Sequence, residues 1–265
     1  QYLVGVPLSG DGAVRLRAGN YAAYVEDEWT VSNQLSVTYG LRMDDPIFFT
    51  KPPFNQSVFD SLGRNTQDVP SGNIQWSPRI GFNWDMTGNQ KNQLRGGVGL
   101  FTGRPAYVWL SNAFPNSGSV GVAQLTCNAS VAPQFNAANV AHPPQSCTNG
   151  LSAKAGGEID LLSKNLKFPQ NARLTVGGDR QLADHWIGTL EAMYTKGLNN
   201  PFYQNIALAG PQSVDSHGRV LYGLTPYNPV LKHADRNTVL DVSNQSHDYA
   251  YNLTAGVQRR FYDRF

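Results

Sequence analysis

Two stretches of this chain alternate apolar and polar side chains over about ten residues, and this alternation constrains the fold more than any other feature. In LSVTYGLRMD (35–44), the odd-numbered residues are apolar or aromatic and the even-numbered ones are small, polar or charged. WSPRIGFNWDM (76–86) repeats the pattern. A period of two is typical of a β-strand with one apolar and one polar face. Both runs reach the ~9–11 residues that a tilted strand needs to cross a bilayer, whereas globular strands average about 5–6. They therefore predict membrane-spanning strands.

Weaker copies of the same pattern occur along the rest of the chain, in Tyr21–Val31, Gln93–Gly103, Ala172–Leu182, Trp186–Lys196 and Tyr251–Val257. A further candidate lies in Phe202–Leu208 or Thr238–Val242, which gives seven or eight spanning strands. Apolar stretches of about 18 residues are absent from the sequence, so helical membrane spans are excluded. Charged residues make up only 15% of the chain and aromatic residues 11%. This composition fits an outer-membrane β-barrel, whose apolar residues are spread out by alternation.

The connections between these strands differ in length. Short turns join the strands pairwise, whereas long segments follow at 45–73, 104–170 and roughly 210–237. Outer-membrane barrels have short periplasmic turns and long extracellular loops, so we expect residues 104–170 to form a long extracellular loop. Aromatic residues near strand ends are expected at the two headgroup levels: Tyr21, Trp29, Trp76, Trp84, Trp186 and Tyr194.

The two cysteines, Cys127 and Cys147, bracket a polar segment of the longest loop. Such a pair predicts a disulfide formed outside the cytosol. Two unrelated free thiols are the alternative.

Many positions on the polar face are glycines, at 40, 81, 97, 99, 177 and 256. Small inward residues would leave a narrow barrel underpacked, but they suit a wide lumen that is occupied by something else. Barrels of ~22 strands have such a plugged lumen. We therefore predict an all-β fold, a transmembrane antiparallel barrel to which residues 1–265 contribute about eight strands; these strands could close a small barrel or belong to a larger one.

An ordered series of motifs makes this prediction more specific. YVEDEW (24–29), LSVTYGLRMD (35–44), SPRIGFNWD (77–85) and LRGGVGLFTGRP (94–105) are followed by VWLSN (108–112), LTVGGDRQL (174–182), GTLEAMYTKG (188–197) and YAYNLTAGVQRRF (249–261). Over roughly residues 19–261, the chain resembles the TonB-dependent outer-membrane receptors of the Oar-like group. The resemblance implies that residues 1–265 are part of a single ~22-stranded barrel domain. It also implies energised uptake of a scarce nutrient in the bacterial outer membrane. It further implies three partners: outer-membrane lipid, the receptor's own plug domain, and the TonB complex. The plug domain, and the segment that the TonB complex would bind, are both absent from this sequence.

Two sets of residues are candidates for function in such a receptor. Polar residues on the lumen side could bind the plug through charge-assisted hydrogen bonds, or could simply be solvated: Arg42, Arg79, Asn83, Arg95, Arg173, Asp179 and Glu191. Aromatic and polar residues of the longest loop are expected to contact the unidentified nutrient: Tyr107, Trp109, Phe114 and Asn116.

Signals for other kinds of chemistry are weak. GGVGLFTG (96–103) lacks the helix that a phosphate-binding loop needs after its glycines, and the five histidines show no metal-ligand spacing. The net charge of +2 comes without a basic run, which argues against nucleic acid. We therefore expect no enzyme activity, cofactor or metal. Two rival hypotheses remain: a complete eight-stranded barrel with an adhesive or structural role, and a secreted carbohydrate-binding β-sandwich.

Overall fold

The computed structural model describes residues 1–7, 15–105, 107–119, 122–134, 136–140, 142–152, 158–225, 228–232, 238–259 and 261. Its long strands are β2 (Ala18–Ser32), β3 (Leu35–Phe48), β4 (Gln75–Asp85), β5 (Asn92–Thr102), β8 (Gln170–Ala183), β9 (Trp186–Gly197) and β16 (Tyr249–Arg259). Shorter strands are β1 (Tyr2–Pro7), β6 (Val122–Cys127), β7 (Ile159–Leu162), β10 (Asn200–Asn205), β11 (Ser213–Val214), β12 (Val220–Leu221), β13 (Gly223–Thr225), β14 (Asn228–Pro229) and β15 (Val239–Gln245). The helices are α1 (Gln56–Leu62), α2 (Tyr107–Asn112) and the single turns η1 (Pro115–Ser117), η2 (Ala129–Val131) and η3 (Ala137–Asn139).

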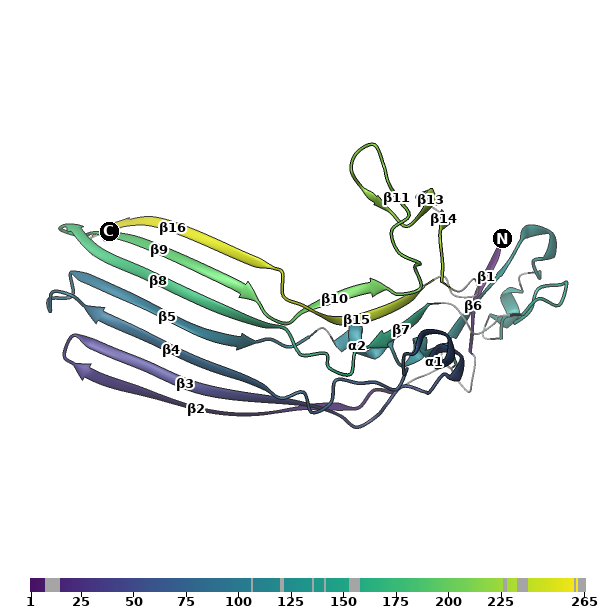
Figure 1. Ribbon diagram of the computed structural model, residues 1–265, viewed down its shortest axis with the longest axis horizontal. Helices are drawn as coiled ribbons and strands as arrows, with labels where there is room; N and C mark the ends of the chain where they lie inside the picture. Colours follow the sequence, from purple (N-terminus) through teal and green to yellow (C-terminus); the bar gives the residue numbers. More distant parts are fainter. Residues whose placement is uncertain are drawn as a thin grey trace.

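The seven long strands form one antiparallel sheet in the order β16-β9-β8-β5-β4-β3-β2 (Figure 1). Each of the seven alternating segments of the sequence is one of these strands, so that prediction is confirmed. Short turns join β2 to β3, β4 to β5 and β8 to β9 at one end of the sheet (left in Figure 1), which we call the short-turn end. Long connections leave the other end, which we call the loop end. The helices of the described residues are too short to cross a membrane.

The cross-strand register gives the sheet an apolar face and a polar face. One lateral row of the apolar face runs across six strands through Tyr39, Ile80, Val98, Leu174, Tyr194 and Tyr251. These side chains keep between 45% and 81% of their surface exposed, so no second sheet covers them in the described part of the chain. A sandwich would bury this face against a second sheet. The β-sandwich hypothesis is therefore wrong.

Aromatic side chains mark both ends of the apolar face. On β2, β4 and β9, two rings are separated by eight residues: Tyr21 and Trp29, Trp76 and Trp84, Trp186 and Tyr194. At about 3.3 Å per residue and a tilt of about 40°, this spacing corresponds to roughly 20 Å along the membrane normal. That height is close to the ~25 Å apolar band of outer-membrane barrels.

The register also shows the tilt of the strands. Trp29 aligns through Val37 with Phe82, which is two residues from Trp84. Trp84 on β4 is level, across β5 and β8, with Leu190 on β9. Trp186 lies four residues nearer the short-turn end than Leu190. The tryptophans thus move steadily toward the short-turn end from β2 to β9. Rings at one membrane depth require such a shift if the strands are tilted.

Two of the sequence-based strand predictions need correction. Phe202–Leu208 and Thr238–Val242 do not contain an eighth spanning strand: β10 pairs with β15, and β15 with β7, in a separate three-stranded sheet at the loop end. β3 continues to Phe48 through Asp-Asp-Pro, a sequence that favours a turn. Pro46 is tolerated because its carbonyl accepts a hydrogen bond from the Gly72 amide, so its nitrogen points away from β2 and no ladder bond is lost.

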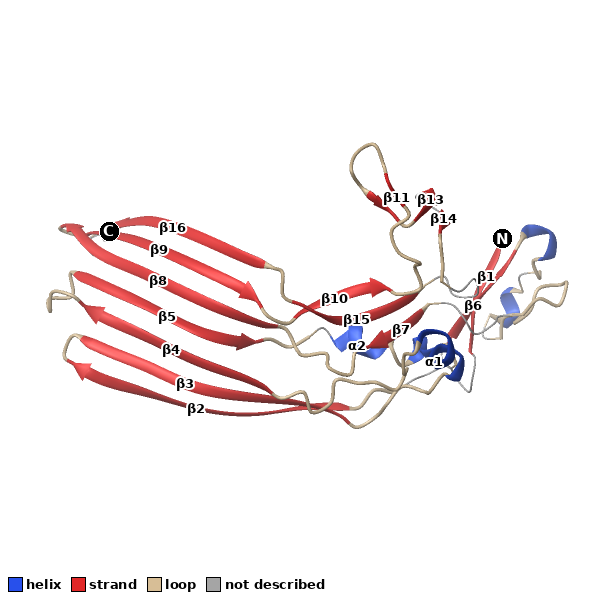
Figure 2. Cartoon of the chain, in the orientation of Figure 1, coloured by secondary structure: helices blue, strands red, loops and turns tan. Residues whose placement is uncertain are grey.

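The long connections, in the described parts of residues 49–74, 103–169 and 198–248, contain a folded unit, the loop body, around β7, β10, β15, α1 and α2, from which the β11–β14 segment projects (Figure 2). Its three-stranded sheet has a helix on each face. Val58 of α1 packs on Ile159 and Val239. Leu110 of α2 packs on the opposite face, in a core that includes Leu162, Val242, Phe114 and Phe168. The long connections are therefore ordered by cores of their own.

Two polar contacts fix this arrangement. The two terminal guanidinium nitrogens of Arg64, Nη1 and Nη2, donate to the Asp241 carboxylate, at 2.6 and 2.5 Å, and so join the first loop to the third. The Gln75 side chain donates to the Phe168 carbonyl and accepts from its amide, both at 2.9 Å. This second contact attaches the loop body to the rim of the sheet, where Gln170 also donates to the Trp76 carbonyl.

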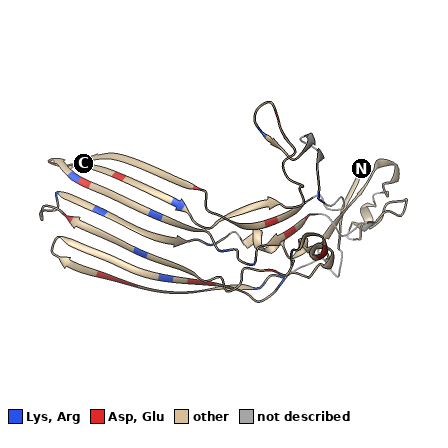
Figure 3. Cartoon of the chain, viewed as in Figure 1, with Lys and Arg blue, Asp and Glu red and all other residues tan. Residues whose placement is uncertain are grey.

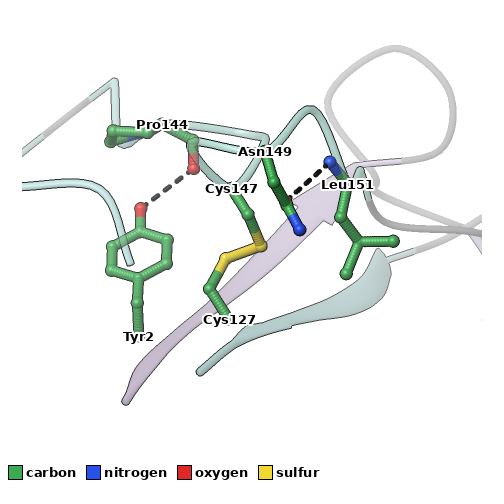
Figure 4. Close-up of a disulfide and its surroundings, with 6 residues drawn as sticks. All are labelled: Tyr2, Cys127, Pro144, Cys147, Asn149 and Leu151. Carbon is green, nitrogen blue, oxygen red and sulfur yellow. Dashed lines mark hydrogen bonds between the residues drawn. A yellow bond between two sulfur atoms is a disulfide. The ribbon is translucent and has the colours of Figure 1, made fainter. Parts of the chain in front are cut away.

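The predicted disulfide is present (Figure 4). Cys127 and Cys147 are bonded across a separation of 20 residues. The bond lies beside the two-stranded β1–β6 sheet, in a small core with Val6 and Leu125. The Tyr2 hydroxyl donates to the Pro144 carbonyl at 2.9 Å, which holds β1 against the closed loop.

Truncating Phe114 to Ala should unfold the loop body locally and leave the spanning sheet intact. Phe114 keeps 2% of its surface exposed, and removing a buried Phe side chain costs about 3–5 kcal/mol. We expect faster cleavage of the loops by added protease in the full receptor, with unchanged heat-modifiable gel migration.

Tyr107→Ala is the matched control, because Tyr107 is 40% exposed. Equal protease sensitivity of the two variants would show that the apolar cores do not hold the loops together.

Candidate functional site: the polar face and the loop body

The seven candidate lumen residues all lie on the polar face of the sheet. The register aligns Asn83 with Arg95, and Gly177 with both Arg95 and Glu191. Arg79 aligns with Gly40 and Gly99, and Asp179 with Gln93 and Thr189. The charged residues of this face are therefore aligned with glycine or with uncharged polar residues on the neighbouring strands, and both acidic and basic residues occur along the sheet (Figure 3). Sequence alternation alone placed these residues on one face correctly.

Arg95 is the centre of the larger charge cluster. It forms ion pairs with Asp179 and with Glu191, the latter at 3.3 Å between Nη2 and Oε2. The Thr189 hydroxyl donates to the other Asp179 oxygen at 2.6 Å. Gly177 lies between Arg95 and Glu191, and a Cβ there would be 3.4–3.5 Å from both side chains. The missing side chain lets an ion pair cross an entire strand.

A second bridge of the same kind joins Arg79 to Glu26, across Gly40. A Cβ on Gly40 would lie 2.9 Å from the Val25 carbonyl oxygen and 3.3 Å from the Glu26 Cβ. Glycine is needed here for the close approach of its neighbours. Sequence reasoning missed Glu26, although its even number in β2 assigns it to the polar face.

The remaining wall residues make local contacts. Arg42 donates to both oxygens of Asp44, at 2.7 and 2.8 Å. The Arg173 guanidinium lies over the Phe101 ring, 5.5 Å from its centroid. Asn83 lines a recess of about 310 Å³ whose lining includes Gly81 and Thr175. The polar face is thus a wall of paired charges with a shallow central recess.

The four candidate loop residues have different environments. Tyr107 and Trp109 on α2 are exposed, and Trp109 packs edge-on against Tyr203 with ring centroids 5.5 Å apart. Phe114 is buried in the core of the loop body and has no free surface for a ligand. Asn116 donates to the Asp160 carboxylate at 2.7 Å. The structure therefore brings together Trp109, Tyr203, Asp160 and Asn116, of which sequence reasoning named two.

Asp160 is buried on β7, with 5% of its surface exposed. Burial raises the pKa of its carboxyl group, the negative charge of Glu158 raises it further, and the hydrogen bond from Asn116 opposes both effects. Burial, together with the Asp160 charge, raises the pKa of the Tyr203 hydroxyl to about 12. Asp160, Asn116 and the Tyr203 hydroxyl thus form a partly buried polar cluster beside the apolar core of the loop body. Groups of three or more His, Cys, Asp or Glu side chains placed to bind a metal do not occur in the described residues.

Comparison with known proteins gives a family match. Residues 3–265 match the family model of the outer membrane beta barrel domain. None of the curated proteins is similar enough in sequence to match the chain.

Solved structures with a similar fold include the siderophore receptor PirA from Acinetobacter baumannii, at 14% identity and a TM-score of 0.50, covering 96% of this chain and 27% of that one. A variant of the ferric enterobactin receptor PfeA from Pseudomonas aeruginosa matches at 13% identity and a TM-score of 0.47, covering 90% of this chain and 24% of that one. The chain thus spans about a quarter of the length of these receptors.

The buried carboxyl group predicts a pH dependence. Because the folded-state pKa of Asp160 is raised, the unfolded chain releases this proton at lower pH than the folded chain does. The unfolding free energy of the loop body should therefore fall as pH rises from the ordinary carboxyl pKa through the raised one. Asp160→Asn should remove this part of the pH dependence and stabilise the loop body at neutral pH. Amide hydrogen exchange in the full receptor measures both effects.

Asp60→Asn, which removes an exposed carboxylate from α1 of the same loop body, is the matched control variant. A loop body that becomes less stable at neutral pH in Asp160→Asn would contradict the account.

Proposed function

Since the chain belongs to the outer membrane beta barrel domain family and lies in the bacterial outer membrane, we propose that it is part of a TonB-dependent receptor of the Oar-like group. In this proposal, the receptor takes up a scarce nutrient through an energised, plugged pore. The sequence motifs that resemble the Oar-like group support this choice, and they extend along most of the chain.

The observation that carries the proposal is the open sheet. Within the described residues, β2 and β16 form opposite edges of the seven strands and do not pair with each other. Unpaired backbone groups cost several kcal/mol each in hydrocarbon, so both edges need neighbouring strands. A closed eight-stranded barrel would require β2 and β16 to approach each other. A wider barrel of ~22 strands with an occupied lumen accommodates this open arc and its glycine-rich wall.

The same proposal assigns the two sides of the membrane. The short-turn end faces the periplasm and the loop body faces the outside, as in other outer-membrane barrels. Residues 104–170 are then extracellular, where an oxidising environment favours the Cys127–Cys147 disulfide. The exposed rings of Tyr107 and Trp109, beside Tyr203, form the surface that we propose for first contact with the nutrient.

The wall has a defined role in this proposal. Arg79 and Arg95 form ion pairs within the wall itself, whereas Arg173 stacks on Phe101 near the loop end. We infer that the plug packs against the glycine recess and binds Arg173, while the paired charges keep the wall polar and rigid. Plug contact by the other six wall residues stays a prediction.

Nutrient uptake tests the proposed transport. We expect a strain lacking the gene for the full receptor to lose growth on one limiting nutrient, drawn from a panel of iron chelates, other metal complexes, oligosaccharides and peptides. The same growth should be lost when the TonB system is deleted, because substrate passage needs the energised plug. Radiolabelled uptake measured with and without a protonophore checks this. Uptake that persists without the proton gradient would support a passive pore instead.

Antibiotic leak tests the wall. Arg79→Ala in the full receptor leaves Glu26 without its partner and should increase entry of a large antibiotic. Glu26→Gln breaks the same ion pair from the other side. Equal leak in the two variants is expected if Arg79 acts within the wall, and greater leak in Arg79→Ala is expected if Arg79 also binds the plug. Unchanged leak in both would remove Arg79 from any role in closing the pore.

A further inference from the structure

A shallow groove lies on the apolar face toward the short-turn end, over β8, β9 and β16. It measures about 450 Å³, and its lining includes Leu182, Leu190 and Val257. The groove exists because two apolar-face positions are glycines: Gly178 aligns with Leu190, and Gly188 aligns with Val257. Leu182 bends over the second glycine, where a Cβ would be 3.0 Å from the Leu182 Cδ1. The floor is therefore backbone and the walls are aliphatic.

Two arginines lie at or beside the half of this groove that is nearer the short-turn end. Arg180 on β8 lines the groove and aligns with Gly188. Arg259 on β16 aligns with Trp186, with its guanidinium 5.4 Å from the Trp186 ring centroid and 4.9 Å from that of Phe261. Ion pairs within the described residues involve neither arginine. Their strands flank β9 and are thus roughly 10 Å apart, which two long side chains can span.

The depth of these arginines fits the charged headgroup region of a membrane. A lipid-facing Arg costs about 2–4 kcal/mol at the bilayer midplane and about 0–1 kcal/mol near an interface. Trp186 is one of the rings expected at headgroup level, and Arg259 stacks on it. An apolar groove that ends at unpaired cations of this depth matches a molecule with an acyl chain and an anionic head.

We propose that this groove binds a glycerophospholipid of the periplasmic leaflet, with one acyl chain along Gly178 and Gly188 and its phosphodiester bound by Arg180 and Arg259. The choice of leaflet rests on the proposed function, which places the short-turn end in the periplasm. Guanidinium groups bind phosphate oxygens through charge-assisted hydrogen bonds. The lipid would cover the backbone that Gly178 on β8 and Gly188 on β9 leave without a side chain, between Leu182, Leu190 and Val257.

The test uses the full receptor, delipidated in mild detergent and titrated with dioleoyl-phosphatidylglycerol, with bound lipid counted by native mass spectrometry. Arg180→Ala and Arg259→Ala should each weaken binding about fivefold, the effect of one basic residue near a membrane surface. Lysine at the same positions should retain most of the binding. Lys196→Ala is the control, because Lys196 lies on the apolar face of β9 at the loop end and should leave binding unchanged.

Gly178→Leu tests the groove itself. A Cβ at Gly178 meets nothing closer than 3.6 Å, so Gly178→Ala should fold and bind lipid like the wild type. The Leu side chain would fill the groove and lower lipid retention, while heat-modifiable migration stays normal.

Equal lipid retention in the wild type, Arg180→Ala, Arg259→Ala and Gly178→Leu would overturn the site. Competition by lipopolysaccharide but not by phosphatidylglycerol would overturn the choice of lipid and leaflet. Energised uptake by the whole receptor is measured in a separate experiment. If the receptor proves to be a passive pore but still binds lipid through the two arginines, the proposed transport is refuted and the lipid site is not.

Discussion

Hydrogen bonding of the backbone in a solvent that offers no partners is the constraint on which this structure depends. In hydrocarbon, each N–H and C=O of a spanning strand must be paired with a neighbouring strand. The seven long strands meet this requirement in an antiparallel sheet whose interior strands are paired on both sides. Only β2 and β16 have an open side within the described residues. For this reason we propose that the sheet is one part of the wall of a wider barrel.

Glycine has two distinct uses in this sheet. On the polar face, Gly40 and Gly177 leave room for ion pairs that reach across a strand, Arg79 to Glu26 and Arg95 to Glu191. On the apolar face, Gly178 and Gly188 open a groove toward lipid. In both cases, a missing Cβ lets groups on the flanking strands interact with each other, or with another molecule, over the backbone.

The alternating runs were enough to predict the seven long strands, their two faces and the face of the seven candidate wall residues. Period-two alternation fixes which side a residue faces without reference to its partners, so Arg42, Arg95 and Glu191 could be assigned from the sequence. The disulfide was foreseen from its polar, loop-like surroundings. Local patterns of this kind persist wherever the strand is regular.

Contacts between residues distant in sequence were decided by the tertiary structure. The partner of Arg79 depends on a register that joins β4 to β2 through β3, and alternation does not encode register. Phe114 looked like an exposed loop residue, yet it packs against Leu162 and Val242 because three loops share a core. β10 and β15 lie in the segments considered for an eighth spanning strand, but they pair with each other, and β15 pairs with β7, outside the seven-stranded sheet. The sequence alone thus determined which face each side chain of the long strands lies on. Only the tertiary structure decided which residues it contacts and which loop residues are buried, because those neighbours are distant in the sequence, as for Arg64 and Asp241, which are 177 residues apart.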